Sequence, residues 1–120
     1  MIKFHGHYCP GVAVGYRVAI LARKELELGR SKDEELVAIV ENDSCAVDAI
    51  QYINGTTFGK GNLIFQDHGL HAYTFIERTS GKKIRIELKT DIFEHVSRKD
   101  FQKRILDISD EELFTVKEVN

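Results

Sequence analysis

The sequence predicts one α+β domain over residues 1–120, in which an antiparallel or mixed sheet packs with helices on one side. Three observations lead to this prediction. Apolar residues recur at helical spacing in two stretches, after residue 10 and after residue 45. Runs of strand-forming residues lie between and beyond these stretches. The helices and strands do not alternate regularly, and this irregular order favours an α+β domain over a repeated βαβ fold.

The first predicted helix covers residues 10–28. Pro10 suits its first turn, because the N–H that proline lacks would have no partner there. Apolar side chains then follow at intervals of three and four residues, and Gly29 provides a C-terminal stop. Cys9 is therefore expected at or beside the N-cap of this helix.

A second helix is predicted from Cys45 to a stop at residues 54–55. Three residues of types favoured at helix N-caps precede it, namely Asn42, Asp43 and Ser44. Cys45 then falls in the first turn of the helix. Asp48 follows three residues later, so it shares a helix face with Cys45. Both cysteines of the chain are thus predicted to lie near helix starts.

The sheet is expected to form from four short runs. Residues 36–40 are almost entirely apolar, which predicts a strand buried on both faces. Residues 83–89 alternate between apolar and charged side chains, as in a strand with one buried face. The other predicted elements are strands at 63–65 and 71–77, a hairpin turn at 79–81, capping patterns at 31–34 and 109–112, and a surface helix at 97–106.

Composition disfavours several classes of function. The net charge is -2, so no basic surface indicates a nucleic-acid or anionic-membrane partner. No segment approaches the roughly 20 apolar residues of a membrane span, and the first residues lack the apolar run of a signal peptide. We therefore expect a cytoplasmic protein, whose two cysteines stay reduced and act as ligands, reactive groups or core residues.

Two imidazoles and a thiol are concentrated in residues 5–9, as His5, His7 and Cys9. If this segment is extended, the three side chains point to one side. Imidazole nitrogen and thiolate sulfur suit zinc best, with iron, nickel or copper as alternatives, and Cys45 could add a further ligand. Helix N-termini also favour the thiolate form of both cysteines. The competing interpretations are a redox pair of cysteines, or histidines that bond the backbone beside cysteines that fill the core.

Four other polar residues are candidates for the same site. Lys60 lies between two glycines, where its ammonium could meet an anionic or carbonyl-bearing ligand, but the pattern is equally typical of a tight turn with an exposed lysine. Asn42, Asp43 and Asp48 have an ordinary interpretation as helix caps and solvated helix surface. Their functional interpretation is to orient Cys45, to hold polar groups of a ligand or to support a metal-bound histidine.

Three stretches of the chain resemble the FmdE family: FHGHYCPG at residues 4–11, VENDSCAVDAIQ at 40–51 and TFGKGNL at 57–63. The resemblance runs from about residue 3 to about residue 116, and its three motifs occur in the family's order. The family takes its name from a component of formylmethanofuran dehydrogenase, the tungsten or molybdenum enzyme of methanogenesis. Many members continue into a C-terminal zinc finger with paired CxxC motifs. No cysteine follows Cys45 here, so we expect the core domain without that finger.

The resemblance implies an α+β core domain that forms a homodimer. It also implies a metal-associated pocket around four residues, His5, His7, Cys9 and Cys45. The pocket would further be lined by residues at matching motif positions, which are Asn42, Asp43, Asp48 and Lys60. Of these, Asn42, Asp43 and Lys60 are expected to contact a ligand.

The expected function is that of a metal-binding accessory subunit or small enzyme in redox or one-carbon metabolism related to methanogenesis. If the protein is catalytic, the reacting groups would come from Cys9, Cys45, Lys60 and Asp48. Two alternatives stay open: a non-catalytic module that binds or delivers a metal or a molybdenum or tungsten cofactor, and a thiol enzyme with Cys9 or Cys45 as nucleophile. Expected partners are a second copy, a redox-enzyme subunit and a small anionic or carbonyl ligand. Two cysteines are too few to hold an iron–sulfur cluster alone.

Overall fold

A five-stranded mixed sheet forms the framework of the domain, with strand order β2-β1-β3-β4-β5. The structure, a computed structural model, describes residues 1–27, 35–89 and 98–119. β1 and β2 are parallel, and the other neighbouring pairs are antiparallel. The strands are β1 (Leu36–Val40), β2 (Leu63–Phe65), β3 (Ala72–Glu77), β4 (Lys83–Leu88) and β5 (Phe114–Glu118).

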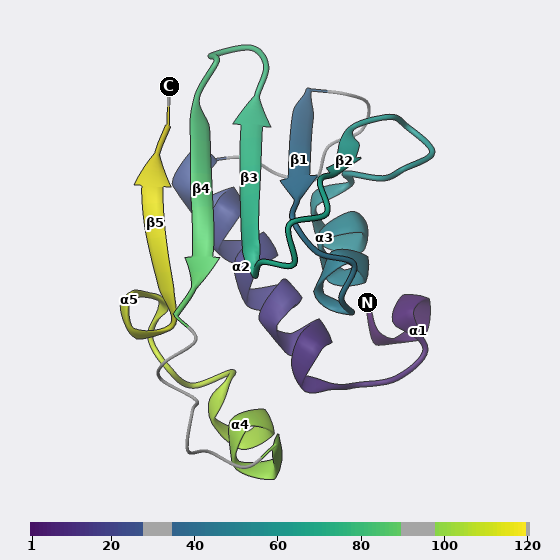
Figure 1. Cartoon of the computed structure of the whole chain (residues 1–120), viewed down its shortest axis with the longest axis vertical. Coiled ribbons are helices and arrows are strands. Elements are labelled where there is room, and N and C mark those ends of the chain that lie inside the picture. The colour runs from purple at the N-terminus through teal and green to yellow at the C-terminus, as the bar shows by residue number, and fades with distance from the viewer. Residues whose placement is uncertain (28–34, 90–97, 120) are drawn as a thin grey trace.

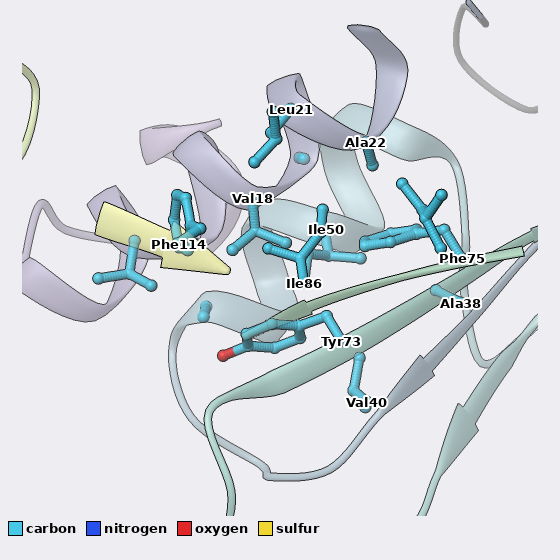
Figure 2. Packing of buried hydrophobic residues seen from close by; sticks show 14 of the residues in the cluster. Val18, Leu21, Ala22, Ala38, Val40, Ile50, Tyr73, Phe75, Ile86 and Phe114 are labelled. Atoms are coloured by element: carbon cyan, nitrogen blue, oxygen red, sulfur yellow. The ribbon is translucent and has the colours of Figure 1, made fainter. Parts of the chain in front are cut away.

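The two longer helices cover one face of this sheet, as Figure 1 shows. The helices are α1 (Ile2–His5), α2 (Pro10–Leu26), α3 (Ala46–Asn54), α4 (Arg98–Arg104) and α5 (Asp110–Leu113). Apolar side chains of α2 and α3 meet those of the central strands in one core, where Tyr73, Phe75 and Ile86 are fully buried (Figure 2). The predicted α+β class, with a mixed sheet and helices on one side, is therefore confirmed.

Most predicted elements are present with shifts of one or two residues at their ends. The Ser109 hydroxyl accepts a hydrogen bond from the Glu112 N–H, as the predicted capping pattern requires. The first helix ends at Leu26 instead of residue 28, because Glu27 adopts a left-handed conformation and its N–H closes onto the carbonyls of Arg23 and Lys24. Both Gly29 and the capping pattern at 31–34 lie outside the described residues.

Two features differ from the sequence-based expectation. Residues 5–9 are not an extended segment: α1 ends at His5, and Gly6 turns the chain with φ 108° while its N–H bonds to the Ile2 carbonyl. A fifth strand, β5, was not predicted from the sequence. It pairs along the whole of β4, and this pairing gives residues 114–118 a hydrogen-bonding template that their own pattern does not reveal.

In the part of the chain that the structure describes, every helix is too short or too polar to cross a membrane.

Candidate metal and thiol site

The N-terminal segment brings three metal-binding side chains together at the start of α2. Ligand atoms of His5, His7 and Cys9 all lie within 4.8 Å of one another. The Nε2 atom of His5 lies 3.9 Å from the Sγ atom of Cys9. The imidazole rings of His5 and His7 face each other with centroids 4.6 Å apart. The side chains therefore converge although the backbone between them turns instead of running straight.

Cys9 is held in place by the helix that follows it. It is the N-cap residue of α2, with φ -148° and ψ 165°, and its Sγ atom accepts a hydrogen bond from the Val12 N–H at 3.4 Å. Pro10 occupies the first helical turn, as its sequence position predicts. The Cys9 side chain is buried, whereas that of His7 is exposed. The three-residue cluster thus opens to solvent on the histidine side.

A carboxylate fixes the orientation of His5. Asp48, in the first turn of α3, accepts a hydrogen bond from Nδ1 of His5 at 2.6 Å. This contact places the proton on Nδ1 and leaves Nε2 directed toward Cys9. The same hydrogen bond raises the pKa of His5. The Gln51 side chain donates to the other oxygen of Asp48 at 3.4 Å, so the carboxylate is itself held on both sides.

Cys45 lies beside Cys9 but is not part of the three-residue cluster. It is the N-cap residue of α3, one position earlier than the predicted first turn. Burial raises the pKa of both thiols, but at Cys9 hydrogen bonds from Val12, Cys45 and His5 outweigh this effect, and the pKa of Cys9 is lowered. Burial and the neighbouring Cys9 raise the pKa of Cys45. The negative charge of the pair therefore resides on Cys9.

Two glycines allow α2 and α3 to approach closely enough for the two cysteines to meet. A Cβ atom on Gly15 would lie 2.3 Å from the Ala46 carbonyl oxygen, and one on Gly11 would lie 3.0 Å from the Cβ atom of Cys45. Neither glycine was identified from the sequence as important to the site. Their spacing of four residues on one helix face is a signal that indicates such an approach.

Asn42 braces the loop that leads into α3 instead of facing a ligand. Its Nδ2 atom donates to the Leu70 carbonyl at 2.8 Å and to the Tyr73 hydroxyl at 3.1 Å, and its Oδ1 atom accepts from the Ser44 N–H at 2.9 Å. These bonds use the polar groups of a side chain that is only 8% exposed. The structure therefore supports its role in positioning Cys45. Asp43 is exposed on the same loop.

Lys60 lies beyond the other end of α3 from Cys45. The nine residues of the helix separate the two by about 13 Å along its axis. The backbone N–H of Lys60 donates to the Thr57 hydroxyl, and buried Asn62 anchors the same loop through bonds to the Leu36 and Gly55 carbonyls. The structure thus brings Asp48 to the cluster but places the Lys60 backbone at a different part of the surface.

A second ionic cluster was missed in the sequence. Glu41, only 6% exposed, accepts hydrogen bonds from His68 at 2.7 Å and from Arg85 at 2.9 Å, and Arg85 also pairs with Glu87. His68 has the sequence context of an ordinary surface histidine, and no local pattern links these residues. They come together because β1, β4 and the segment before β3 meet at one end of the sheet.

The geometry is compatible with two chemistries. Three nitrogen and sulfur donors with a carboxylate behind one histidine form a familiar arrangement for binding a transition metal. The series Asp48, His5 and Cys9 also resembles an orienting acid, a base and a nucleophile, with the Asp48–His5 contact at 2.6 Å and the His5–Cys9 contact at 3.9 Å. Both chemistries use the same atoms, so one excludes the other at any moment.

Comparisons with known proteins agree with the fold and the motifs. A probable S-adenosyl-L-methionine-binding protein of Archaeoglobus fulgidus is 36% identical over 110 residues, which cover 88% of this chain but 29% of that protein. This chain thus spans less than a third of that relative. The crystal structure of a tungsten formylmethanofuran dehydrogenase FmdE-like protein from Syntrophus aciditrophicus matches with a TM-score of 0.75 at 25% identity, covering 98% of this chain and 67% of the other.

The family model FmdE, described as molybdenum formylmethanofuran dehydrogenase operon, matches residues 4–117. The matched region begins one residue before His5 and ends in β5, so it contains the whole candidate site and all five strands. The chain therefore belongs to the FmdE family.

Proposed function

We propose that the chain is a metal-binding FmdE-family protein whose metal is held by His5, His7 and Cys9. The observation that carries this proposal is the convergence of their three ligand atoms within 4.8 Å. The Asp48 carboxylate on Nδ1 of His5 adds support, because metal-bound histidines commonly donate their second N–H to such a group. Cys9, the cysteine with the lowered pKa, supplies the thiolate that a metal requires.

Zinc is the metal that this donor set fits best, with nickel or iron as alternatives. Three protein ligands leave one tetrahedral position for water or substrate, which is the pattern of a catalytic rather than a structural zinc site. A bound zinc ion would polarise a substrate oxygen or acidify a water molecule. An open position favours a small enzyme over a module that only stores or delivers metal.

The proposal is tested by metal analysis of protein purified without an affinity tag. We expect about one zinc ion per chain, and we expect Cys9→Ser and His5→Ala to lose it while retaining the fold. Cys45→Ser is the matched control, because Cys45 lies outside the three-residue cluster, and it should keep most of the metal. Absence of metal after reconstitution with zinc, in a folded protein, would contradict the proposal. Equal loss in Cys45→Ser would instead place Cys45 among the ligands.

A second candidate function, a thiol enzyme with Cys9 as nucleophile, is favoured by the lowered pKa of Cys9 and by its contact with His5. In metal-free protein, iodoacetamide should alkylate Cys9 faster than Cys45, with release of iodide and formation of a carbon–sulfur bond. Peptide mass spectrometry measures the two rates separately. Added zinc should protect Cys9 if the metal occupies the cluster. Faster reaction at Cys45 would argue against Cys9 as the nucleophile.

The wider role that we propose is an accessory subunit or small enzyme in redox or one-carbon metabolism within a reducing compartment such as the cytoplasm. The support is family membership together with two free cysteines, Cys9 and Cys45. We also propose a homodimer, whose mass by light scattering should be twice the 13.7 kDa of one chain. A single-chain mass at micromolar concentration would count against the dimer. Co-purification with a redox enzyme from a native extract would test the proposed partner.

A further inference from the structure

An exposed pair of aromatic rings lies directly beside the candidate metal cluster. The rings of Phe4 and Tyr52 have centroids 5.8 Å apart and are inclined at 35°. Phe4 is 54% exposed and Tyr52 is 47% exposed. Most large apolar side chains of a folded protein avoid this degree of exposure when they can pack inside. The pair therefore presents aromatic surface to solvent next to a reactive site.

The position of the ring pair follows from how α1 lies against α3. His5 contacts Asp48, and the preceding residue, Phe4, contacts Tyr52. Asp48 and Tyr52 are four residues apart, so they project from one face of α3 about one turn from each other. The rings thus stand about 5–6 Å along the helix from the carboxylate that orients His5. This distance is close to the size of one aromatic ring.

The open side of the metal cluster faces the same solvent region. Cys9 closes the buried side, while His7 is exposed and the adjacent Tyr8 is 39% exposed. A molecule that coordinates a metal at the fourth position must approach from the exposed side. A ligand of suitable length can therefore reach the metal and the aromatic surface at once.

We propose that the Phe4–Tyr52 pair is a stacking platform for the ligand of this site, and that this ligand carries a planar aromatic ring next to an oxygen-containing metal-binding group. The inference rests on the proposed metal-binding function. Aromatic rings stack on one another in offset or tilted arrangements, and such contacts add to affinity beyond simple burial. The oxygen donors bind the metal, and the ring adds selectivity.

The test compares two zinc ligands that differ by one ring. Benzohydroxamate and acetohydroxamate offer the metal the same two oxygen donors, and only the first has an aromatic ring. Each is titrated by calorimetry into zinc-loaded protein, with zinc content measured before and after. We expect benzohydroxamate to bind about tenfold more tightly. Equal affinities for the two ligands would overturn the platform.

Variants then assign the preference to the ring pair. Phe4→Leu and Tyr52→Leu keep an apolar side chain without a ring, so they should reduce the benzohydroxamate preference to about twofold or less while acetohydroxamate affinity stays unchanged. Phe4→Tyr should restore the preference. Phe65→Leu is the matched control, because Phe65 is 52% exposed but lies on β2, and it should behave as the unmodified chain. A preference that survives both leucine variants would overturn the assignment.

The outcomes separate this inference from the proposed function. If the chain binds zinc and acetohydroxamate without preferring the aromatic ligand, the platform fails and the metal site stands. If the folded chain binds no zinc, the proposed metal site fails, and the platform fails with it. Unchanged zinc affinity in Phe4→Leu and Tyr52→Leu shows that these variants have kept the fold around His5.

Discussion

Replacement of Gly15 by alanine tests whether close helix packing sets the position of the two cysteines. The new Cβ atom would lie 2.3 Å from the carbonyl oxygen, 2.6 Å from the Cα atom and 2.8 Å from the carbonyl carbon of Ala46. Ordinary carbon contacts need roughly 3.5–4.0 Å. All three atoms belong to the backbone of α3, so no side-chain rotation relieves the overlap, and the helices must move apart by about 1 Å.

The expected net cost is about 2 kcal/mol of unfolding free energy. Overpacking of a core costs about 1–3 kcal/mol, and a clash with backbone belongs at the upper end. Alanine recovers about 1 kcal/mol, because glycine is a poor residue inside a helix such as α2. For a domain of this size, a loss of about 2 kcal/mol lowers the melting temperature by roughly 8 °C.

Urea unfolding followed by circular dichroism measures this change. Gly59→Ala is the control, since a Cβ atom there meets nothing within 4 Å, and it should alter stability by less than about 0.5 kcal/mol. Gly11→Ala should give an intermediate loss, because its closest neighbour is a single side-chain atom of Cys45 at 3.0 Å. If Gly15→Ala is as stable as the unmodified chain, the helix approach is not under the constraint inferred from the Ala46 contacts.

Three further predictions concern polar contacts. Asp48→Asn should weaken zinc binding about 10–100-fold, and should shift the acid limit of binding downward because the carboxylate no longer raises the pKa of His5; competition titrations across pH measure both, and an unchanged affinity would contradict the role of Asp48. Glu41→Gln should cost about 1–3 kcal/mol at neutral pH. Burial opposes the charged form of Glu41, but its ionic partners lower its pKa, so this cost should shrink as the pH falls through that value; a cost independent of pH would refute the assignment. Asn62→Ala should cost about 3 kcal/mol in urea unfolding, because its fully buried amide joins the loop to Leu36 and Gly55; a loss below about 1 kcal/mol would show that the loop does not depend on it.

Local patterns in the sequence predicted the helices and four of the five strands. Apolar spacing and capping residues act over a few positions, so the helix that begins at Pro10 and the strand Leu36–Val40 were found with small errors at their ends. The missed strand, Phe114–Glu118, depends on pairing with β4. The turn at Gly6 was missed because one short helix can replace an extended segment without changing the polar pattern.

The candidate site was predictable in its residues but not in its arrangement. The HxHxC pattern places His5, His7 and Cys9 close together under almost any local backbone. The link from His5 to Asp48 spans 43 residues and depends on how α1 lies on α3. Similarly, the sequence offers Asn42 as a ligand or a cap, and only the surrounding carbonyl and hydroxyl groups show that its amide is already used.

Residue type and spacing alone establish that two cysteines begin two helices and that two histidines precede the first of them. These features are local, because side-chain type controls backbone conformation over one or two turns. The packing of the elements determines which cysteine carries the charge, which carboxylate supports His5, and that the Lys60 loop lies beyond the far end of α3. These outcomes depend on the distance between packed elements, and that distance is set by contacts such as the one between Gly15 and Ala46.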